Sequence, residues 1–415
     1  MSALPAPQPA TEQRPATGAE RVSAGYRWVA ASIIALGSIA SILSSTVVNV
    51  AVPTLQNAFH ASLTDVQWIA TAYLLGLSAV IPVSGWMSDR FGTKRTYVTT
   101  LALFILASFL CGFATSTGTE IAFRVVQGLA GGMVMPVGMT MLMRMTPPHE
   151  RGRIMGVVGI PMMVAPALGP LVAGWLLEHF SWPYIFWINI PFCALALVFA
   201  AIKLQESKTE SAGPLDVVGL ILCTPGVTVF IYGVTRAADT GWGSAQALVP
   251  MVAGIALTAA FVLWELRQPR PLLELKVFRD AAYSASIGVS ILIAVGMFGA
   301  MFVVPIFMQE VQGYSSLDAG WVMAAQGIGA VTALPVSGYL TDRYGARPVV
   351  LAGVCALILV TLWLAQVQPE TTKETWALIL VGRGLAMGFT MMPAFSAAYL
   401  TLPPMLISRA TALSN

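Results

Sequence analysis

The chain has 415 residues, of which 57% are hydrophobic and 10% are charged, and its mean hydropathy is +0.77. A soluble globular domain carries about 25% charged residues, so this composition excludes an ordinary soluble protein. The formal net charge is only +3, and no feature of the sequence indicates nucleic-acid binding. A phosphate-binding loop of the type Gly-x-x-x-x-Gly-Lys-Ser/Thr is absent, which excludes a nucleotide-driven motor of that class. The sequence therefore predicts a multi-pass membrane protein that is not an enzyme.

Residues 1–25 are rich in Ala, Pro, Thr and Gln and lack an apolar core, which predicts a disordered cytoplasmic tail. Apolar segments of about 20 residues follow, the length of a helix that crosses about 30 Å of hydrocarbon. Lipid offers the backbone no hydrogen bonds, so we expect these segments to be helices. Twelve helices are predicted, at about 28–52, 66–87, 96–113, 120–143, 154–177, 184–204, 215–234, 245–264, 281–308, 321–340, 349–367 and 376–400.

These helices divide the chain into consecutive units. The predicted fold is an all-α membrane protein of two helical bundles with a helix pair inserted between them. Because the first bundle has more helices than the second, we expect two further helices to be missing, as in a truncated product or a partial chain. The units are the tail 1–25, a six-helix bundle 26–204, a linker 205–214, the inserted pair 215–266, an amphipathic cytoplasmic loop 267–280, the first four helices of the second bundle 281–403, and the start of a thirteenth helix 404–415.

A short polar hairpin occurs twice, at 85–95 and 338–347, each time between two apolar runs. Both copies contain Gly-x-x-x-Asp-Arg-aromatic-Gly with a following base, and repeated helical halves are typical of transporters. Asp89 and Asp342 would each hold a helix N-terminus of the opposite half, a contact that breaks when the cytoplasmic side opens. The alternative is that the hairpins only anchor the chain. The residues assigned to gating are Gly85, Asp89, Arg90, Gly92, Arg95, Asp342 and Arg343.

Most of the 22 Lys and Arg residues fall in the tail or in every second loop. By the positive-inside rule, this distribution places the N-terminus and both hairpins in the cytoplasm.

Arg124 lies inside the fourth predicted helix, where a charged side chain costs about 2.5 to 3.5 kcal/mol. Glu120 precedes it by one turn on the same face, a spacing suited to pairing, and Gln127 follows. These three residues are candidates for a coupling step, in which Arg124 would tune the movement of a proton or of a substrate anion. The alternative is that Arg124 only satisfies backbone carbonyls of neighbouring helices.

Polar and flexible side chains inside other helices are candidates for a substrate cavity, although packing explains them as well. The cavity candidates are Ser44, Asn49, Met297 and Met301. The four cysteines and three histidines are scattered without ligand spacing, so no metal site is predicted.

The hairpin at 85–95 resembles the signature hairpin of the major facilitator superfamily, and residues 124–132 resemble its fourth-helix motif. Residues 46–53 and 187–191 resemble the 14-helix drug:proton antiporter branch of EmrB/QacA type, which also carries an inserted helix pair. The fifth helix resembles the superfamily's antiporter motif, and its prolines allow it to bend. The matching motif residues are Gly156, Gly169, Pro170 and Gly174, with alanine in place of glycine at 165 and 173.

This resemblance implies an exporter of small amphipathic or toxic compounds in the bacterial inner membrane, working by alternating access. It implies the proton gradient as energy source and no cofactor. One departure is that Ser44 stands where the branch usually has an Asp, which leaves Glu120, Asp89 and Glu310 as coupling candidates.

Two other functions stay open from the sequence alone. The chain would also suit an exporter of one specific metabolite, or a sensor or incomplete fragment that does not transport. The partners expected are a small-molecule substrate and the lipid bilayer. Whether a periplasmic adaptor protein docks is also open.

Overall fold

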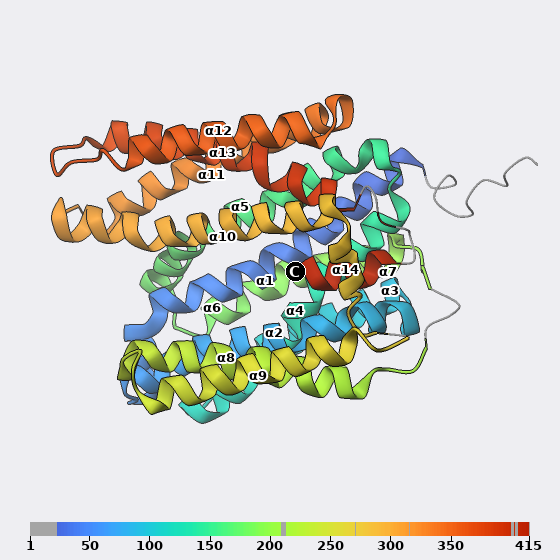
Figure 1. Cartoon of the computed structure of the whole chain (residues 1–415). Helices are drawn as coiled ribbons and strands as arrows, with labels where there is room; N and C mark the ends of the chain where they lie inside the picture. Colours follow the sequence, from blue (N-terminus) through green and yellow to red (C-terminus); the bar gives the residue numbers. More distant parts are fainter. Residues whose placement is uncertain are drawn as a thin grey trace, which may run out of the picture.

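The computed structural model describes residues 23–208, 213–269, 271–314, 316–399, 402 and 406–414. Regular structure in these residues is helical throughout, and the helices run side by side in two bundles (Figure 1). Most of the predicted tail and part of the predicted linker lie outside the described residues.

The first bundle follows the predicted order of helices. Pro53 does not end the first helix, since α1 continues six residues beyond it before His60 takes a left-handed conformation with φ 50°. The sixth predicted helix is divided into a short turn and a longer segment. The helices are α1 (Ala24–Phe59), α2 (Leu63–Phe91), α3 (Thr93–Cys111), α4 (Thr117–Met145), α5 (Arg151–His179), α6 (Tyr184–Trp187) and α7 (Asn189–Lys203), with the 3-10 turn η2 (Pro148–Glu150) before α5.

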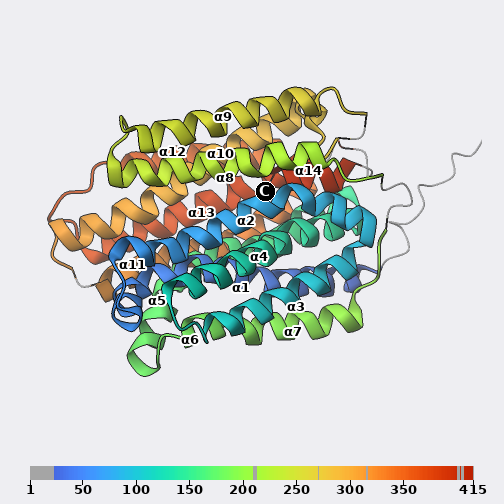
Figure 2. The ribbon, with the colours of Figure 1, turned by 90° about the horizontal axis from the view of Figure 1, so that it is seen from below.

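The inserted pair and the second bundle follow. The two inserted helices pack against each other, and α8 lies on α2 of the first bundle (Figure 2). A helix also forms where the start of a thirteenth was predicted. The elements are α8 (Val217–Thr240), α9 (Ala245–Glu265), the 3-10 turn η3 (Leu275–Arg279), α10 (Ala281–Ile306), the π turn η4 (Phe307–Val311), α11 (Ser316–Tyr344), α12 (Ala346–Leu364), α13 (Lys373–Ala398) and α14 (Ile407–Ser414).

Within the described residues, ten helices are long and apolar enough to cross a membrane. An eleventh is added if α5 counts as one span, because its segments Arg151–Pro166 and Leu171–His179 meet at 52°. The chain is therefore a multi-pass membrane protein, while the predicted count of twelve helices is not confirmed.

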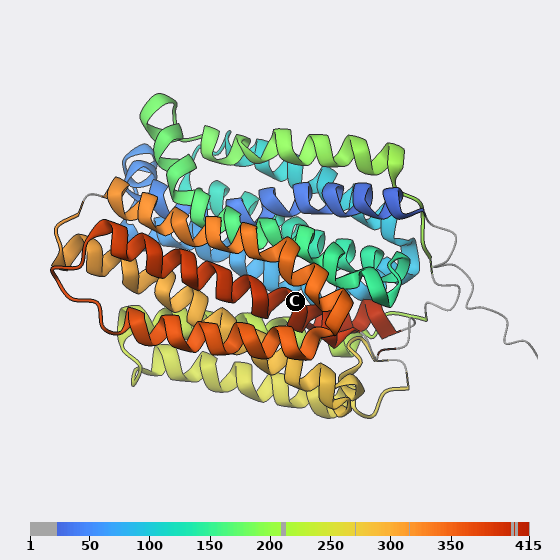
Figure 3. The same ribbon diagram turned by 90° about the horizontal axis from the view of Figure 1, so that it is seen from above.

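The two bundles repeat one packing scheme. In the first, α4 packs against α1, α2 and α3, and in the second, α13 packs in the same way against α10, α11 and α12. The bundles meet where α5 lies along α11 and α13 (Figure 3) and where α14 lies on α2 and α4. The helix after α4, which is α5, thus packs on the second bundle. The helix after α13, which is α14, packs on the first.

Candidate functional site

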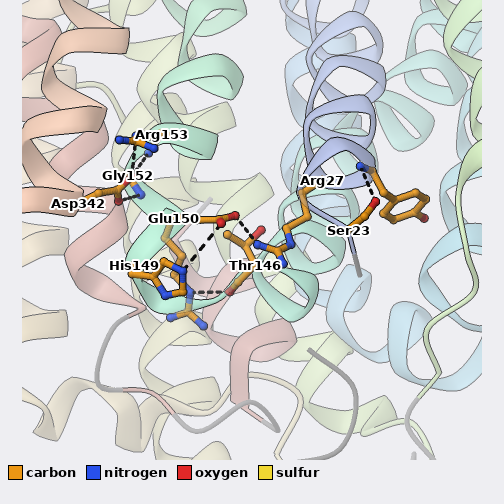
Figure 4. A network of polar contacts seen from close by, with 10 residues as sticks. Ser23, Arg27, Thr146, His149, Glu150, Gly152, Arg153 and Asp342 are labelled. Atoms are coloured by element: carbon orange, nitrogen blue, oxygen red, sulfur yellow. Dashed lines mark hydrogen bonds and ion pairs between the residues drawn. The ribbon is translucent and has the colours of Figure 1, made fainter. Parts of the chain in front are cut away.

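Asp342, near the end of α11, caps the N-terminus of α5 in the opposite bundle. One carboxylate oxygen accepts a hydrogen bond from the backbone N–H of Gly152 at 2.8 Å, and the other accepts from the N–H of Arg153 at 3.1 Å (Figure 4). The Arg153 guanidinium lies 3.7 Å from the second oxygen. Since α5 has no side-chain cap of its own, Asp342 supplies the anion that the positive end of this helix favours. The contact predicted for Asp342 is present.

A second contact across the bundles lies beside this cap. The guanidinium of Arg151, the first residue of α5, donates to the backbone oxygen of Tyr399 at 2.6 Å, and Tyr399 follows α13. Arg151 is buried. Sequence reasoning used this residue only as a positive charge for topology and missed its role. Nothing in its local sequence indicated a partner 248 residues away.

Asp89, the repeat counterpart of Asp342, forms an ion pair with Arg144 at the end of α4. Both side chains are mostly buried, and α14 packs against the two helices that carry them. Arg27 on α1 pairs in turn with Glu150, just before α5 (Figure 4). We call this end of the molecule, with the turns after α2 and α11, the hairpin end.

The remaining hairpin residues have different surroundings. Gly92 has φ +94°, which favours glycine, and a Cβ there would lie 2.3 Å from the Glu206 carboxylate. Glu206 accepts hydrogen bonds from the N–H groups of Lys94 and Arg95, at 3.0 and 3.1 Å, and so caps α3. Sequence reasoning missed Glu206, an acid in the linker. Gly85 is buried, whereas Arg90, Arg95 and Arg343 are exposed.

Glycines allow α5 and α11 to approach closely near the hairpin end. A Cβ on Gly156 would lie 2.8 Å from the backbone oxygen of Leu334, and one on Gly338 would lie 2.7 Å from the backbone oxygen of Gly152. Backbone atoms cannot move aside as a flexible side chain can. Glycine is therefore required where these two helices cross.

The other residues of the predicted antiporter motif do not belong to this crossing. A Cβ on Gly169 would meet the Thr46 hydroxyl of α1 at 2.1 Å, so this glycine serves packing within the first bundle. Gly174 has no neighbouring atom within 4 Å of its Cβ position. The side chain of Pro170 lies outside the described residues.

Arg124 is completely buried in α4 and connects several helices. Its Nε donates to the Ile69 oxygen of α2 at 3.1 Å, and its terminal nitrogens donate to the hydroxyl and backbone oxygens of Ser44 on α1 at 2.9 and 3.2 Å. It also donates to Gln127 Oε1 at 2.5 Å, and the Gln127 amide donates to Ser108 on α3 at 2.7 Å. The cation is thus held by neutral acceptors from three helices.

Glu120 does not form the ion pair with Arg124 that its spacing predicted. Neither Glu120 oxygen has a hydrogen-bond partner among the described residues, so no hydrogen bond joins it to the guanidinium. The reason is that the guanidinium donors point to Ser44, Ile69 and Gln127 instead. The Arg124 guanidinium carbon also lies 4.3 Å from the Tyr73 ring centre, a cation–π contact.

Arg383 on α13 is the repeat counterpart of Arg124. It donates to Gln326 of α11 at 3.0 Å and to the Gly296 oxygen of α10 at 2.5 Å. Beside it is an apolar cavity of about 490 Å³ between α10, α12 and α13. The counterparts of α10 and α12 in the first bundle are α1 and α3, and α7 packs on the groove between them. This cavity occupies the corresponding groove of the second bundle, on its outer side.

Three of the four predicted substrate-cavity residues, Ser44, Asn49 and Met297, do not line this cavity. Ser44 is buried against Arg124, and Asn49 is exposed. Met297 is buried in the apolar core shared by both bundles, and the side chain of Met301 lies outside the described residues. Their part in a substrate cavity stays a prediction. No group of three potential metal ligands occurs in the described part of the chain.

The sequence profile of the Major Facilitator Superfamily matches residues 34–415. The chain is 36% identical over 391 residues to a multidrug resistance protein B homolog of Mycobacterium tuberculosis (strain H37Rv), covering 92% of this chain and 72% of that protein. It is 30% identical over 383 residues to the tetracenomycin C resistance and export protein of Streptomyces glaucescens, covering 91% and 71%. It is 28% identical over 403 residues to the lincomycin resistance protein LmrB of Listeria monocytogenes, covering 97% and 85%.

Solved structures agree on the fold. The proton:xylose symporter XylE superimposes with a TM-score of 0.67 at 14% identity, covering 95% of this chain and 86% of that one. The human organic anion transporter MFSD10 gives 0.62 at 13% identity, covering 94% and 90%. With a profile match over nearly the whole chain, the protein belongs to the major facilitator superfamily.

Proposed function

We propose that this transporter is a secondary active exporter of small amphipathic or toxic compounds that works by proton antiport. The names of its relatives support export, because they include a tetracenomycin C export protein and proteins of multidrug and lincomycin resistance. The motifs of the 14-helix drug:proton antiporter branch and the inserted pair α8 and α9 support the same proposal. The charge distribution supports a cytoplasmic hairpin end in a bacterial inner membrane.

The observation that carries the mechanism is the closure of the two bundles at the hairpin end. Asp342 caps α5, Arg151 binds the end of α13, and α5 crosses α11 through glycines, all within one region. Farther along α5, Gly169 packs against α1 of its own bundle instead. Polar contacts at one end of a crossing can break and form again as the bundles rock, which alternating access requires.

Transport into proteoliposomes with an imposed pH gradient tests this proposal. We expect uptake of ethidium, an amphipathic cation, and of lincomycin to follow the gradient and to stop when a protonophore removes it. A gradient of one pH unit should support an accumulation of about tenfold if one proton exchanges for one substrate molecule. Substrate binding without any flux would contradict the exporter assignment. Flux that ignores the pH gradient would contradict antiport alone.

A further inference from the structure

Glu120 is a buried acid without the partners that buried acids normally have. Its residue exposure is 0%, and neither carboxylate oxygen has a hydrogen-bond partner among the described residues. Burying an ionised carboxylate without hydrogen bonds costs several kcal/mol, whereas the neutral acid is much less costly to bury. The surroundings of Glu120 as described therefore suit the protonated form.

Few charged or titratable groups surround this acid. From its own helix Arg124 faces it one turn away, from α3 the Cys111 thiol lies beside it, and from α2 Tyr73 stacks on the Arg124 guanidinium. Helix α1 contributes the neutral Ser44 to the same group. Among the described residues the acceptors of the Arg124 guanidinium are all neutral, namely Ser44, Ile69 and Gln127. Glu120 is thus the one described carboxyl whose charge Arg124 can balance over a short distance.

The guanidinium therefore has two alternative sets of partners. When Glu120 is protonated, Arg124 binds Ser44, Ile69 and Gln127, as in the structure. When Glu120 loses its proton, an unpaired carboxylate stands at the i−4 position of the same helix, the spacing at which Glu and Arg side chains meet. The attraction between unlike charges in a dry site then draws the guanidinium away from α1 and α2.

We propose that Glu120 is the proton-binding carboxyl of the exchange, and that Arg124 passes its charge state to α1 and α2 by changing partners. The inference rests on the proposed proton antiport. A proton from the outer solution binds the Glu120 carboxylate to give the neutral acid and restores the bonds of Arg124 to Ser44 and Ile69. The same proton leaves Glu120 for the inner solution in the opposite conformation, so one proton enters for each substrate exported.

Other acids named from the sequence fit this role less well. Asp89 is already paired with Arg144, and Glu310 is exposed in the π turn η4. Glu265 at the end of α9 is buried, but one of its oxygens accepts a hydrogen bond from the N–H of Leu273 and it lies in the inserted pair. Among the acids of the described residues, Glu120 alone combines burial, carboxylate oxygens without hydrogen bonds and a buried base one turn away.

The direct test is proton release from the purified full chain in weakly buffered detergent solution containing a pH dye. Ethidium added to the wild type should release protons, because substrate and proton binding oppose each other by linkage. Glu120→Gln, which has nearly the same shape and cannot titrate, should bind ethidium but release none. In liposomes it should lose the tenfold accumulation driven by one pH unit and keep downhill ethidium exchange. Glu310→Gln is the matched control and should behave as the wild type.

Each outcome bears on the inference separately from the transport proposal. Proton release and uphill accumulation by Glu120→Gln at wild-type levels would overturn the role of Glu120 and leave antiport intact. A wild type that transports ethidium without regard to pH would remove antiport, and the inference with it. If Glu120→Gln does not fold, the infrared C=O band of a protonated carboxyl tests whether Glu120 binds the proton. That band should titrate in the wild type and shift in Glu120→Asp, and an unchanged band would overturn the inference.

Discussion

Replacing Asp342 by Ala should open the hairpin end of the transporter. The substitution removes both acceptors of the α5 cap, which bind the N–H groups of Gly152 and Arg153 at 2.8 and 3.1 Å, while leaving the glycine crossing in place. Asp342→Asn keeps the shape but removes the charge and one of the two acceptors, because the amide nitrogen donates, so it should have an intermediate effect.

The size of the effect follows from the interactions that Asp342 makes with α5. Hydrogen bonds to a charged group contribute about 1.5 to 3 kcal/mol, and an anion at a helix N-terminus contributes about 0.3 to 1 kcal/mol. The pair with Arg153 adds little, because the Arg153 side chain is 46% exposed. Water replaces part of these interactions in the open state, so we take about 2 to 3 kcal/mol for the whole cap. That change moves the equilibrium between closed and open hairpin ends by about 30- to 150-fold.

Distance measurement between spin labels on the two bundles would detect this shift. Arg95 and Arg347 are exposed at the hairpin end, one on each bundle, so we expect a cysteine at either position to leave the packing unchanged. Cys355 is exposed and should first be changed to Ser, while the other three cysteines are buried. The matched control is Asp318→Asn, which breaks an ion pair with Lys373 inside the second bundle.

The wild type and Asp318→Asn should give a short-distance population that Asp342→Ala reduces in favour of a longer one. Equal distance distributions in all three proteins, at the same reconstitution yield, would refute the reasoning. The cap would then contribute to α5 alone and would not hold the bundles together.

Three further substitutions test other parts of the structure. Gly156→Val places methyl groups against the Leu334 oxygen, which should cost about 1 to 3 kcal/mol of strain. We therefore expect loss of drug resistance at normal membrane levels. Gly174→Val is the control and should be tolerated, because no atom lies within 4 Å of that Cβ position. Arg124→Ala removes bonds to two other helices and should abolish export at normal membrane levels, and unchanged resistance would remove its proposed role. Ser44→Asp places a carboxylate directly at the Arg124 guanidinium. Combined with Glu120→Gln, it should restore some of the pH-driven accumulation that Glu120→Gln loses. A double variant that accumulates no more than Glu120→Gln would contradict this compensation.

Much of the helical architecture could be predicted because it depends on local properties. Apolar length located the helices, and the repeated hairpin indicated that Asp342 would meet the opposite half. The 52° bend in α5 lies among its prolines, whose missing N–H groups interrupt the helix bonds. The predicted end of α1 was wrong, because one proline removes one backbone bond and the remaining bonds carried the helix to Phe59.

The polar partners could not be predicted, because they depend on contacts between distant segments. Glu206 and Arg151 each bind a backbone group that is more than 100 positions away in the chain. Glu120 and Arg124 show the opposite failure. Their i, i+4 spacing on one helix favoured an ion pair, yet Ser44 and Ile69 from other helices provide the acceptors.

The internal repeat shows that the fold itself does not require an acid at position 120. Arg124 and Arg383 are counterparts, each bound to the helix that begins its bundle and to the next one. One turn before Arg383 stands Ile379, which is buried as Glu120 is. An apolar side chain fills this position at no electrostatic cost, whereas a carboxylate there loses its hydration without gaining hydrogen bonds. Because an apolar side chain packs at this position equally well, the acid in the first bundle is better explained by a function that only a titratable group can perform. The proton-binding site is therefore expected on α4 and not on α13.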